Sequence, residues 1–202
     1  MSKVKICGLS REEDVEAANL VLPDFIGFVF AQSRRRVDMI AAAALKEKLD
    51  PRIGTVGVFV NERIETIAEI YQRGIIDWAQ LHGDEDDGYI KRLKEYCGCQ
   101  VIKAVCVGDA LPSLPVEPDY LLFDTLSEQR GGTGRTFAWD VIKSYRGLPL
   151  FLSGGLSAAN VAAAIHTIAP YCVDVSSGVE TDGIKDAGKI REFVHTVRGV
   201  LQ

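Results

Sequence analysis

Short apolar runs alternate with longer amphipathic stretches along the whole of this 202-residue chain. An apolar run of about four to eight residues is typical of a buried strand, and apolar positions about three or four residues apart are typical of a helix. The pattern predicts strands at Val4–Cys7, Phe25–Phe30, Thr55–Val60, Ile76–Leu81, Val101–Cys106, Tyr120–Asp124, Leu150–Ser153 and Cys172–Ser176. It predicts helices at Arg11–Leu22, Met39–Leu49, Ile64–Arg73, Tyr89–Tyr96, Trp139–Tyr145, Ala158–Ile168 and Asp186–Leu201.

The repeated strand–helix unit indicates a parallel sheet with helices packed outside it. Eight strands in about 200 residues reach the lower size limit of a TIM barrel, a closed ring of parallel strands. A doubly wound open sheet is the competitor, but it normally has fewer strands, and no GxGxxG or GxxxxGK[ST] motif follows the first strand. No linker or low-complexity tract divides the chain. We therefore expect an α/β fold with all strands parallel, a single-domain TIM (β/α)8 barrel over residues 1–202.

Residues suited to helix ends stand near several of the predicted boundaries. Ser10 and Glu13 have the spacing of a capping box, in which two side chains accept hydrogen bonds from free backbone N–H groups. Asn61 and Ser157 are suited to begin helices, and Gly98 is suited to end one.

The alternation of side chains along a strand predicts which polar groups meet. Lys5 and Cys7 share one face of the first strand, Asp124 lies opposite its apolar neighbours in the sixth, and Asp174 lies on the polar face of the eighth. If the apolar faces meet the helices, Cys7, Asp124 and Asp174 point into the barrel. We expect them to converge near the C-terminal mouth, where TIM-barrel enzymes have their active sites.

Asp124 stands at the end of a buried strand and is followed by a loop with Gly131, Gly132 and Gly134. A carboxyl group at the tip of a barrel strand, under a glycine loop that closes over it, is typical of a catalytic acid or base. The alternative is that Asp124 only caps the following turn.

Two glycine–serine loops follow the seventh and eighth strands. The first contains Gly154 and Gly155, and the second contains Ser177 and Gly178. In TIM barrels these two loops commonly bind phosphate, because backbone N–H groups approach the oxygens closely where glycine leaves room. The alternative is a tight strand–helix turn without a ligand, and two such loops at the two appropriate positions favour phosphate binding.

Three further side chains are candidates for the barrel mouth. Cys7 ends the first strand with Lys5 two residues earlier, and a lysine favours the reactive thiolate, although a free cysteine is usually a small buried apolar residue. Arg35 lies in an arginine-rich loop that either pairs with a substrate carboxylate or is simply solvated. His82 ends the fourth strand and either lines the mouth or caps a turn.

Net charge, the length of the apolar runs and the cysteine spacing exclude several kinds of partner and site. A net charge of −5 and a pI near 5.3 argue against nucleic acid or an anionic membrane as the main partner, so local groups must hold an anionic ligand. No apolar run approaches the roughly 18 residues of a membrane span. Five cysteines without a CxxC pair support neither a zinc site nor a disulfide framework. We expect a cytoplasmic protein with no metal.

Several segments, in this order and spacing, resemble the phosphoribosylanthranilate isomerase family, single-domain barrels of tryptophan biosynthesis. They are VKICGL (4–9), DFIGFVF (24–30), QSRRRV (32–37), GVFVN (57–61), QLHG (80–83), LLFDT (121–125), GGTGRTFAWD (131–140), FLSGGLSAANV (151–161) and VDVSSGVE (173–180). Each segment alone is a weak signal, but together they span nearly the full length.

The resemblance implies an aldose–ketose isomerase that converts N-(5-phosphoribosyl)anthranilate to 1-(2-carboxyphenylamino)-1-deoxyribulose 5-phosphate by an Amadori rearrangement. By this resemblance Asp124 is the general acid, Cys7 is the general base, and Arg35 holds the anthranilate carboxylate. The phosphate loops and two contacts to ribose hydroxyls are implied at Gly154, Gly155, Ser177, Gly178, Asp174 and His82. The implied partner is a small phosphosugar, with no cofactor, and the enzyme is a monomer or a homodimer.

Two segments depart from the family pattern. Ser33-Arg34-Arg35 stands where the family usually has Ser-Pro-Arg, so a stiff proline is lost beside the arginine. Thr181-Asp182-Gly183 replaces a proline–glycine turn. Neither departure removes a reacting group.

Two other functions compete with the isomerase. A related lyase of the indole-glycerol-phosphate synthase type needs catalytic lysines at strand ends, and the expected inward lysines, Lys5 and Lys103, lie too deep. A catalytically silent phosphosugar-binding barrel would leave Cys7 and Asp124 with structural roles only.

Overall fold

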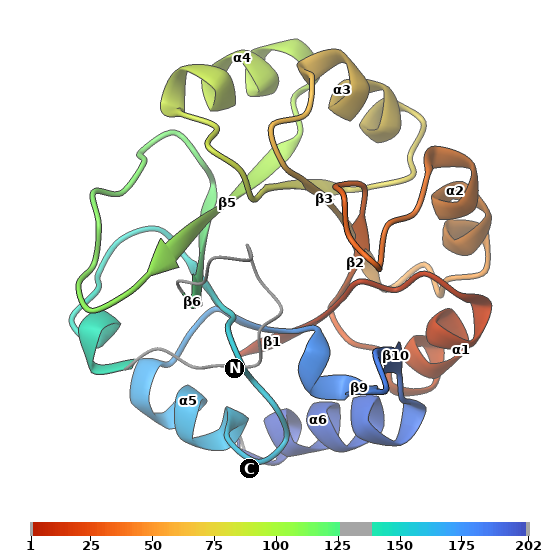
Figure 1. Ribbon diagram of the computed structural model, residues 1–202, viewed down its shortest axis with the longest axis vertical. Coiled ribbons are helices and arrows are strands. Elements are labelled where there is room, and N and C mark those ends of the chain that lie inside the picture. The colour runs from red at the N-terminus through yellow and green to blue at the C-terminus, as the bar shows by residue number, and fades with distance from the viewer. Residues whose placement is uncertain (1, 126–138, 201–202) are drawn as a thin grey trace.

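The computed structural model describes residues 2–125 and 139–200. Eight strands hydrogen-bond in chain order and close into one ring, because β8 pairs with β1, and every neighbouring pair is parallel. They are β1 (Lys3–Cys7), β2 (Phe25–Val29), β3 (Gly54–Phe59), β4 (Trp78–Leu81), β5 (Gln100–Val107), β6 (Tyr120–Thr125), β7 (Leu150–Leu152) and β8 (Cys172–Val175). The helices lie outside the ring (Figure 1). The expected TIM (β/α)8 barrel is confirmed.

The six described α-helices that cover the ring differ in length from those that the apolar pattern predicts. They are α1 (Glu12–Val21), α2 (Met39–Glu47), α3 (Ile64–Gln72), α4 (Asp87–Cys97), α5 (Val161–Ile168) and α6 (Ala187–Gly199), with two short 3-10 helices, η1 (Trp139–Ile142) and η2 (Ser177–Val179). Five of the six α-helices are shorter than predicted, and α4 is longer, because it begins at Asp87 instead of Tyr89 and ends at Cys97 instead of Tyr96. In the part of the chain described, no helix has the length and hydropathy needed to span a bilayer.

Two of the predicted helices differ from the structure by more than a residue or two at their ends. The predicted helix Trp139–Tyr145 is only the 3-10 turn η1, since Gly147 and Pro149 follow closely and leave no room for further turns. The helix predicted from Ala158 begins at Val161, because Asn160 organises a turn before it. The Asn160 side chain accepts a hydrogen bond from the Ser157 N–H and donates one to the Gly155 carbonyl.

Aspartates are the N-caps of three of the six α-helices in the described residues. Asp38, Asp86 and Asp186 accept hydrogen bonds from backbone N–H groups at the starts of α2, α4 and α6. Asp14 accepts hydrogen bonds from the Ser10 and Arg11 N–H groups near the start of α1. The N-cap of α1 is Arg11 and its acidic partner is Asp14, so the expected Ser10–Glu13 capping box is wrong in both residues.

Two further predicted helix ends have opposite outcomes. Asn61 is not the N-cap of α3, which begins after Arg63, and Asn61 instead has a left-handed φ of 51°. Gly98 ends α4 as predicted, with a φ of 71° and its N–H donating to the Lys94 carbonyl.

Two apolar layers follow the alternation along the strands. The layer inside the barrel contains Phe25, Val56, Ile102, Ala104, Leu122, Phe151 and Cys172. The layer between strands and helices includes Val4, Ile6, Ile26, Phe28, Leu121, Phe123, Leu152, Val173 and Val175. Burial of these two layers supplies the main driving force for closing the ring.

Lys103 does not point into the barrel, although the sequence predicts that both Lys5 and Lys103 do. Its neighbours Ile102 and Ala104 point into the barrel, so Lys103 lies on the outer face of β5, and the expectation that it points inward is wrong. Its Nζ donates to the Gly83 carbonyl at 2.7 Å and pairs with Glu85 at 2.9 Å. Lys103 therefore ties the loop after β4 to the neighbouring strand.

Aromatic rings close the N-terminal end of the barrel. Phe25, Trp78 and Tyr120 begin their strands, and Phe151 and Tyr171 lie beside them. The Trp78 ring centroid is 4.5 Å from that of Phe25 and 4.9 Å from that of Tyr120. Contacts at these distances are in the range of favourable aromatic pairs. We call these five side chains the aromatic plug.

A short hairpin extends the chain between β8 and α6. Its antiparallel strands are β9 (Glu180–Thr181) and β10 (Ile184–Lys185), and Glu180 stands opposite Lys185 in the register. The two turn residues, Asp182 and Gly183, have positive φ values of 51° and 80°. Two positive φ values are the mark of a type I′ turn, for which Asp-Gly is a preferred sequence.

Candidate active site

A cavity of about 690 Å³ opens at the C-terminal mouth of the barrel. Its lining includes Cys7, Arg35, His82, Asp124, Asp174 and Ser176. The expected convergence of Cys7, Asp124 and Asp174 is therefore what the structure shows, and His82 lines the mouth rather than only ending a turn.

Cys7 ends β1 and is almost fully buried, with 9% of its surface exposed. A glycine faces it on β2: a Cβ added to Gly27 would lie 2.8 Å from the Cys7 sulfur. Burial raises the pKa of the Cys7 thiol above its ordinary value, and the positive charges of Lys5 and Lys185 act against that rise. Lys5 therefore favours the thiolate, as expected, but burial outweighs its effect on the pKa of Cys7.

Lys5 and Asp174 form an ion pair inside the barrel, with Lys5 Nζ 2.9 Å from Asp174 Oδ2. Burial alone would lower the pKa of Lys5, but the charges of Asp174 and Cys7 and the hydrogen bonds to them together outweigh burial, and the pKa is raised. Burial raises the pKa of Asp174 and the charge of Lys5 opposes the rise. Asp174 Oδ1 has no hydrogen-bond partner among the described residues, so this oxygen at the cavity wall is able to accept one from a ligand.

Asp124 is the penultimate residue of β6, is 5% exposed and faces His82. His82 Nε2 lies 3.4 Å from Asp124 Oδ2, longer than an ordinary hydrogen bond. On the other side of the ring, His82 Nδ1 lies 3.0 Å from the Gln80 side-chain nitrogen. With the Gln80 amide as donor, Nδ1 is the acceptor, and a neutral His82 carries its proton on Nε2, toward Asp124.

The two glycine–serine loops lie against each other at the rim. Gly154 and Gly155 have φ values of 89° and 64°, which favour glycine. A Cβ added to Gly178 would lie 1.9 Å from the Leu156 carbonyl oxygen, so only glycine lets the loop after β8 approach the loop after β7 this closely. The structure thus brings the predicted phosphate residues, Ser177 among them, to one side of the mouth. Their neighbours Ser153 and Ser176 line the cavity.

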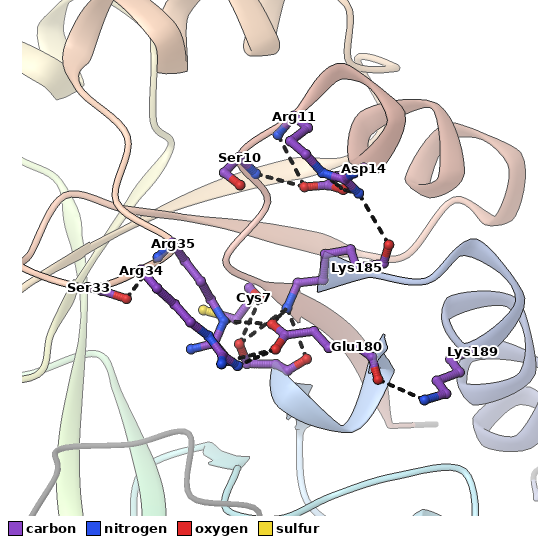
Figure 2. A network of polar contacts seen from close by, with 11 residues as sticks. Cys7, Ser10, Arg11, Asp14, Ser33, Arg34, Arg35, Glu180, Lys185 and Lys189 are labelled. Carbon is purple, nitrogen blue, oxygen red and sulfur yellow. Dashed lines mark hydrogen bonds and ion pairs between the residues drawn. The ribbon is translucent and has the colours of Figure 1, made fainter. Parts of the chain in front are cut away.

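Arg35 is held by a residue that the sequence analysis does not predict. Its Nε and Nη2 donate to the two carboxylate oxygens of Glu180 at 2.6 and 2.9 Å (Figure 2). Lys185 Nζ lies 2.7 Å from Glu180 Oε1, and Arg34 also pairs with this carboxylate. Burial alone would raise the pKa of Glu180, but Arg35 and Lys185 outweigh it and lower the pKa to about 2.

The Asp182-Gly183 dipeptide is the only sequence signal for this cluster, since it predicts a hairpin that brings Glu180 and Lys185 face to face. Nothing local in the sequence links that hairpin to Arg35, which is 145 residues away from Glu180 along the chain.

The glycine loop with Gly131, Gly132 and Gly134 lies outside the described residues, so its predicted closure over Asp124 stays a prediction. Among residues 2–125 and 139–200, no cluster of three or more histidine, cysteine, aspartate or glutamate side chains is placed to hold a metal ion.

Comparisons with known proteins agree over nearly the whole chain. The family model described as N-(5′-phosphoribosyl)anthranilate (PRA) isomerase matches residues 4–196. The N-(5′-phosphoribosyl)anthranilate isomerase of Endomicrobium trichonymphae is 48% identical over 201 residues, covering 99% of this chain and 100% of the relative. That of Caldanaerobacter subterraneus subsp. tengcongensis is 46% identical, with complete coverage of both chains.

Two solved structures extend the comparison to three dimensions. The phosphoribosyl anthranilate isomerase of Thermotoga maritima has a TM-score of 0.86 and 35% identity, covering 98% of this chain and 100% of its own. A phosphoribosyl anthranilate isomerase in complex with reduced 1-(o-carboxyphenylamino)-1-deoxyribulose 5-phosphate has a TM-score of 0.83 and 35% identity, with the same coverage.

Proposed function

The chain belongs to the N-(5′-phosphoribosyl)anthranilate isomerase family, and on this premise we propose which of its side chains carry each step of the reaction. The reaction is the Amadori rearrangement of N-(5-phosphoribosyl)anthranilate to 1-(2-carboxyphenylamino)-1-deoxyribulose 5-phosphate, in tryptophan biosynthesis. The observation that carries the residue assignment is the meeting of Cys7 and Asp124, from β1 and β6, in one cavity that Arg35 also lines.

Asp124 acts as the general acid in the first step. It donates its proton to the ribose ring oxygen while the bond from that oxygen to C1 breaks, and the anthranilate nitrogen lone pair forms the C1=N double bond of an iminium ion. The position of Asp124 at the end of β6, 5% exposed on the cavity wall, supports this role. A positioned acid or base typically contributes about 10²- to 10⁴-fold to a rate.

Cys7 acts as the general base in the second step. Its thiolate removes the C2 proton, and the electron pair of the C2–H bond forms the C1=C2 bond of an enolamine as the iminium is neutralised. The enolamine then tautomerises: the C2 hydroxyl loses its proton, and C1 gains one to give the ketone. Cys7 now holds a proton and Asp124 has lost one, so one exchange with solvent restores both groups.

The two ends of the substrate are bound by separate groups. Arg35 holds the anthranilate carboxylate, and backbone N–H groups of the two rim loops hold the phosphate, which is the proposed role of Gly154, Gly155, Ser177 and Gly178. Asp174 and His82 bind ribose hydroxyls between them. The unpartnered Asp174 Oδ1 and the rim position of the glycines support this arrangement.

The assay follows the fluorescence of phosphoribosylanthranilate as it is consumed. We expect Cys7→Ala and Asp124→Asn each to lower kcat by at least about 100-fold. Matched controls are Cys97→Ala, a cysteine on α4, and Asp109→Asn, an exposed aspartate after β5; both should retain wild-type turnover. Full activity in the Cys7 or Asp124 variant would remove that residue from the mechanism.

We propose that the chain works as one barrel domain over residues 1–202, in the cytoplasm, as a monomer or a homodimer. A phosphoribosylanthranilate isomerase of Thermotoga maritima, 33% identical with a TM-score of 0.82, is described as dimeric and was also obtained as monomers. Sedimentation velocity of the full chain distinguishes the two states.

A further inference from the structure

Glu180 lies outside the ring of strands, yet its carboxylate contacts a residue of the cavity wall. Both of its oxygens accept hydrogen bonds from the Arg35 guanidinium, at 2.6 and 2.9 Å (Figure 2). We propose that Glu180, clamped by Lys185 across the β9–β10 hairpin, is a positioning residue that aims Arg35 at the substrate carboxylate. The inference rests on the proposed role of Arg35.

The geometry leaves Arg35 able to bind a second carboxylate. A guanidinium has five N–H donors in a rigid planar fork, and Glu180 takes one from Nε and one from Nη2. The three other donors are one N–H of Nη2 and two of Nη1, and the Nη1–Nη2 end of the same plane offers a second two-point contact. A two-point contact fixes the orientation of the whole plane, so holding one edge directs the other. Arg35 lines the cavity, so these remaining donors are available to a ligand bound there.

The hairpin explains why the Glu180 carboxylate can serve as a fixed support. The Asp182-Gly183 turn sets Glu180 opposite Lys185, and Lys185 Nζ lies 2.7 Å from Glu180 Oε1. Lys189 of α6 donates to the Glu180 carbonyl at 2.7 Å. The side chains of both Glu180 and Lys185 are buried. The carboxylate is therefore held through its own backbone as well as through its oxygens.

The same contacts connect the hairpin to the strand end that carries Cys7. Lys185 Nζ donates to the Ser176 carbonyl at 2.9 Å, and the Ser176 hydroxyl donates to the Cys7 carbonyl at 3.0 Å. The hairpin thus supports the substrate-binding arginine and the end of β1 from one side. Its contact with the thiol is indirect, so loss of the Glu180 charge should affect substrate binding more than the chemical step.

The Glu180 carboxylate holds Arg35 without cancelling the positive charge at the substrate-carboxylate site. The Glu180 carboxylate pairs with three cations, Arg34, Arg35 and Lys185, so the cluster has a surplus of positive charge. That surplus attracts the carboxylate of the substrate. Without the Glu180 charge, Arg35 and Lys185 would face each other as like charges with no anion between them, and Arg35 would turn away.

The test is Glu180→Gln, which keeps the shape of the side chain and removes its charge. We expect KM for phosphoribosylanthranilate to rise about 10- to 100-fold, the effect of losing a charge-assisted contact. We expect kcat to stay within about 3-fold, because the hairpin does not touch the reacting atoms. Glu69→Gln is the matched control: Glu69 pairs with Arg73 on the exposed face of α3 and should leave both constants unchanged.

A double variant separates positioning from general loss of structure. If Glu180 acts through Arg35, Glu180→Gln raises KM no further in a chain that already carries Arg35→Met. Additive effects, or an unchanged KM in Glu180→Gln alone, would overturn the inference. An unchanged KM in Arg35→Met alone would instead refute the proposed role of Arg35. If Glu180→Gln does not fold, Lys185→Gln removes the clamp from the other side, and it must raise KM in the same way for the inference to stand.

Discussion

Replacement of Lys5 by methionine would leave the Asp174 carboxylate without its cation in the barrel interior. Lys5 is fully buried, Asp174 is 5% exposed, and Lys5 Nζ lies 2.9 Å from Asp174 Oδ2. The apolar side chains of the interior layer, such as Ile102 and Leu122, provide no replacement charge. We therefore expect Lys5→Met to lower the free energy of unfolding by much more than a surface substitution would.

The magnitude follows from two opposing terms. At 2.9 Å, two unit charges attract by about 6 kcal/mol with an effective dielectric constant of about 20. Burial of each ion costs several kcal/mol, so the pair as a whole is close to neutral for stability. Removal of one partner leaves the burial cost of the other uncompensated, which typically destabilises by about 3–5 kcal/mol. For a chain of this length, that corresponds to a fall in Tm of roughly 6–20 °C.

The assay is a double-mutant cycle measured by urea unfolding, with Lys5→Met, Asp174→Leu and the double variant. Each single variant should lose about 3–5 kcal/mol, and the double variant should regain most of that loss, because apolar side chains then fill the site. The deficit of Lys5→Met should shrink as the pH falls. An unpaired Asp174 has a folded-state pKa above its unfolded pKa, so protonation stabilises the folded state between those two values.

A loss of less than about 1 kcal/mol in each single variant, as for an exposed ion pair, would show that the buried charges do not depend on each other. A loss in the double variant equal to the sum of the single losses would likewise show that no coupling exists between Lys5 and Asp174.

Three further predictions concern the thiol and one helix end. Because burial raises the pKa of Cys7, the thiolate fraction and kcat/KM should keep rising from pH 7 through pH 9; a pH–rate profile that is flat over this range would contradict that role. Gly27→Ala places a methyl group 2.8 Å from the Cys7 sulfur and should lower kcat by about 10-fold with an unchanged circular dichroism spectrum. Asp86→Ala removes the N-cap of α4 and should cost about 1 kcal/mol in urea unfolding without loss of activity, whereas Asp86→Ser should cost little.

The fold and the inner site residues are predictable from the sequence because both depend on strand alternation. The alternation of side chains along a strand does not depend on the conformation of the loops. It therefore predicts from the sequence that Cys7, Asp124 and Asp174 lie in one cavity. Glycines required by backbone geometry, such as Gly154 and Gly178, are similarly visible, because a side chain would be strained or would collide there.

The rest depends on contacts between distant parts of the chain, which no local pattern records. Arg35 could be identified as a binding residue, but its anchor Glu180 could not, because the two meet only after the ring has closed. The sequence predicts Lys103 inside the barrel, whereas its side chain pairs with Glu85, which is 18 residues away along the chain. The helix predicted at Trp139–Tyr145 is wrong because apolar spacing does not take into account how few residues separate this segment from Pro149.

The aromatic plug determines how substrate enters the cavity and how product leaves it. Since stacked rings block one end, the described part of the barrel leaves the C-terminal mouth as the route to Cys7 and Asp124. Substrate must then enter, and product must leave, through the same C-terminal mouth. Accumulated product should therefore inhibit the enzyme competitively with respect to substrate. If product release through this mouth is rate-limiting, kcat should fall as the viscosity of the solvent rises.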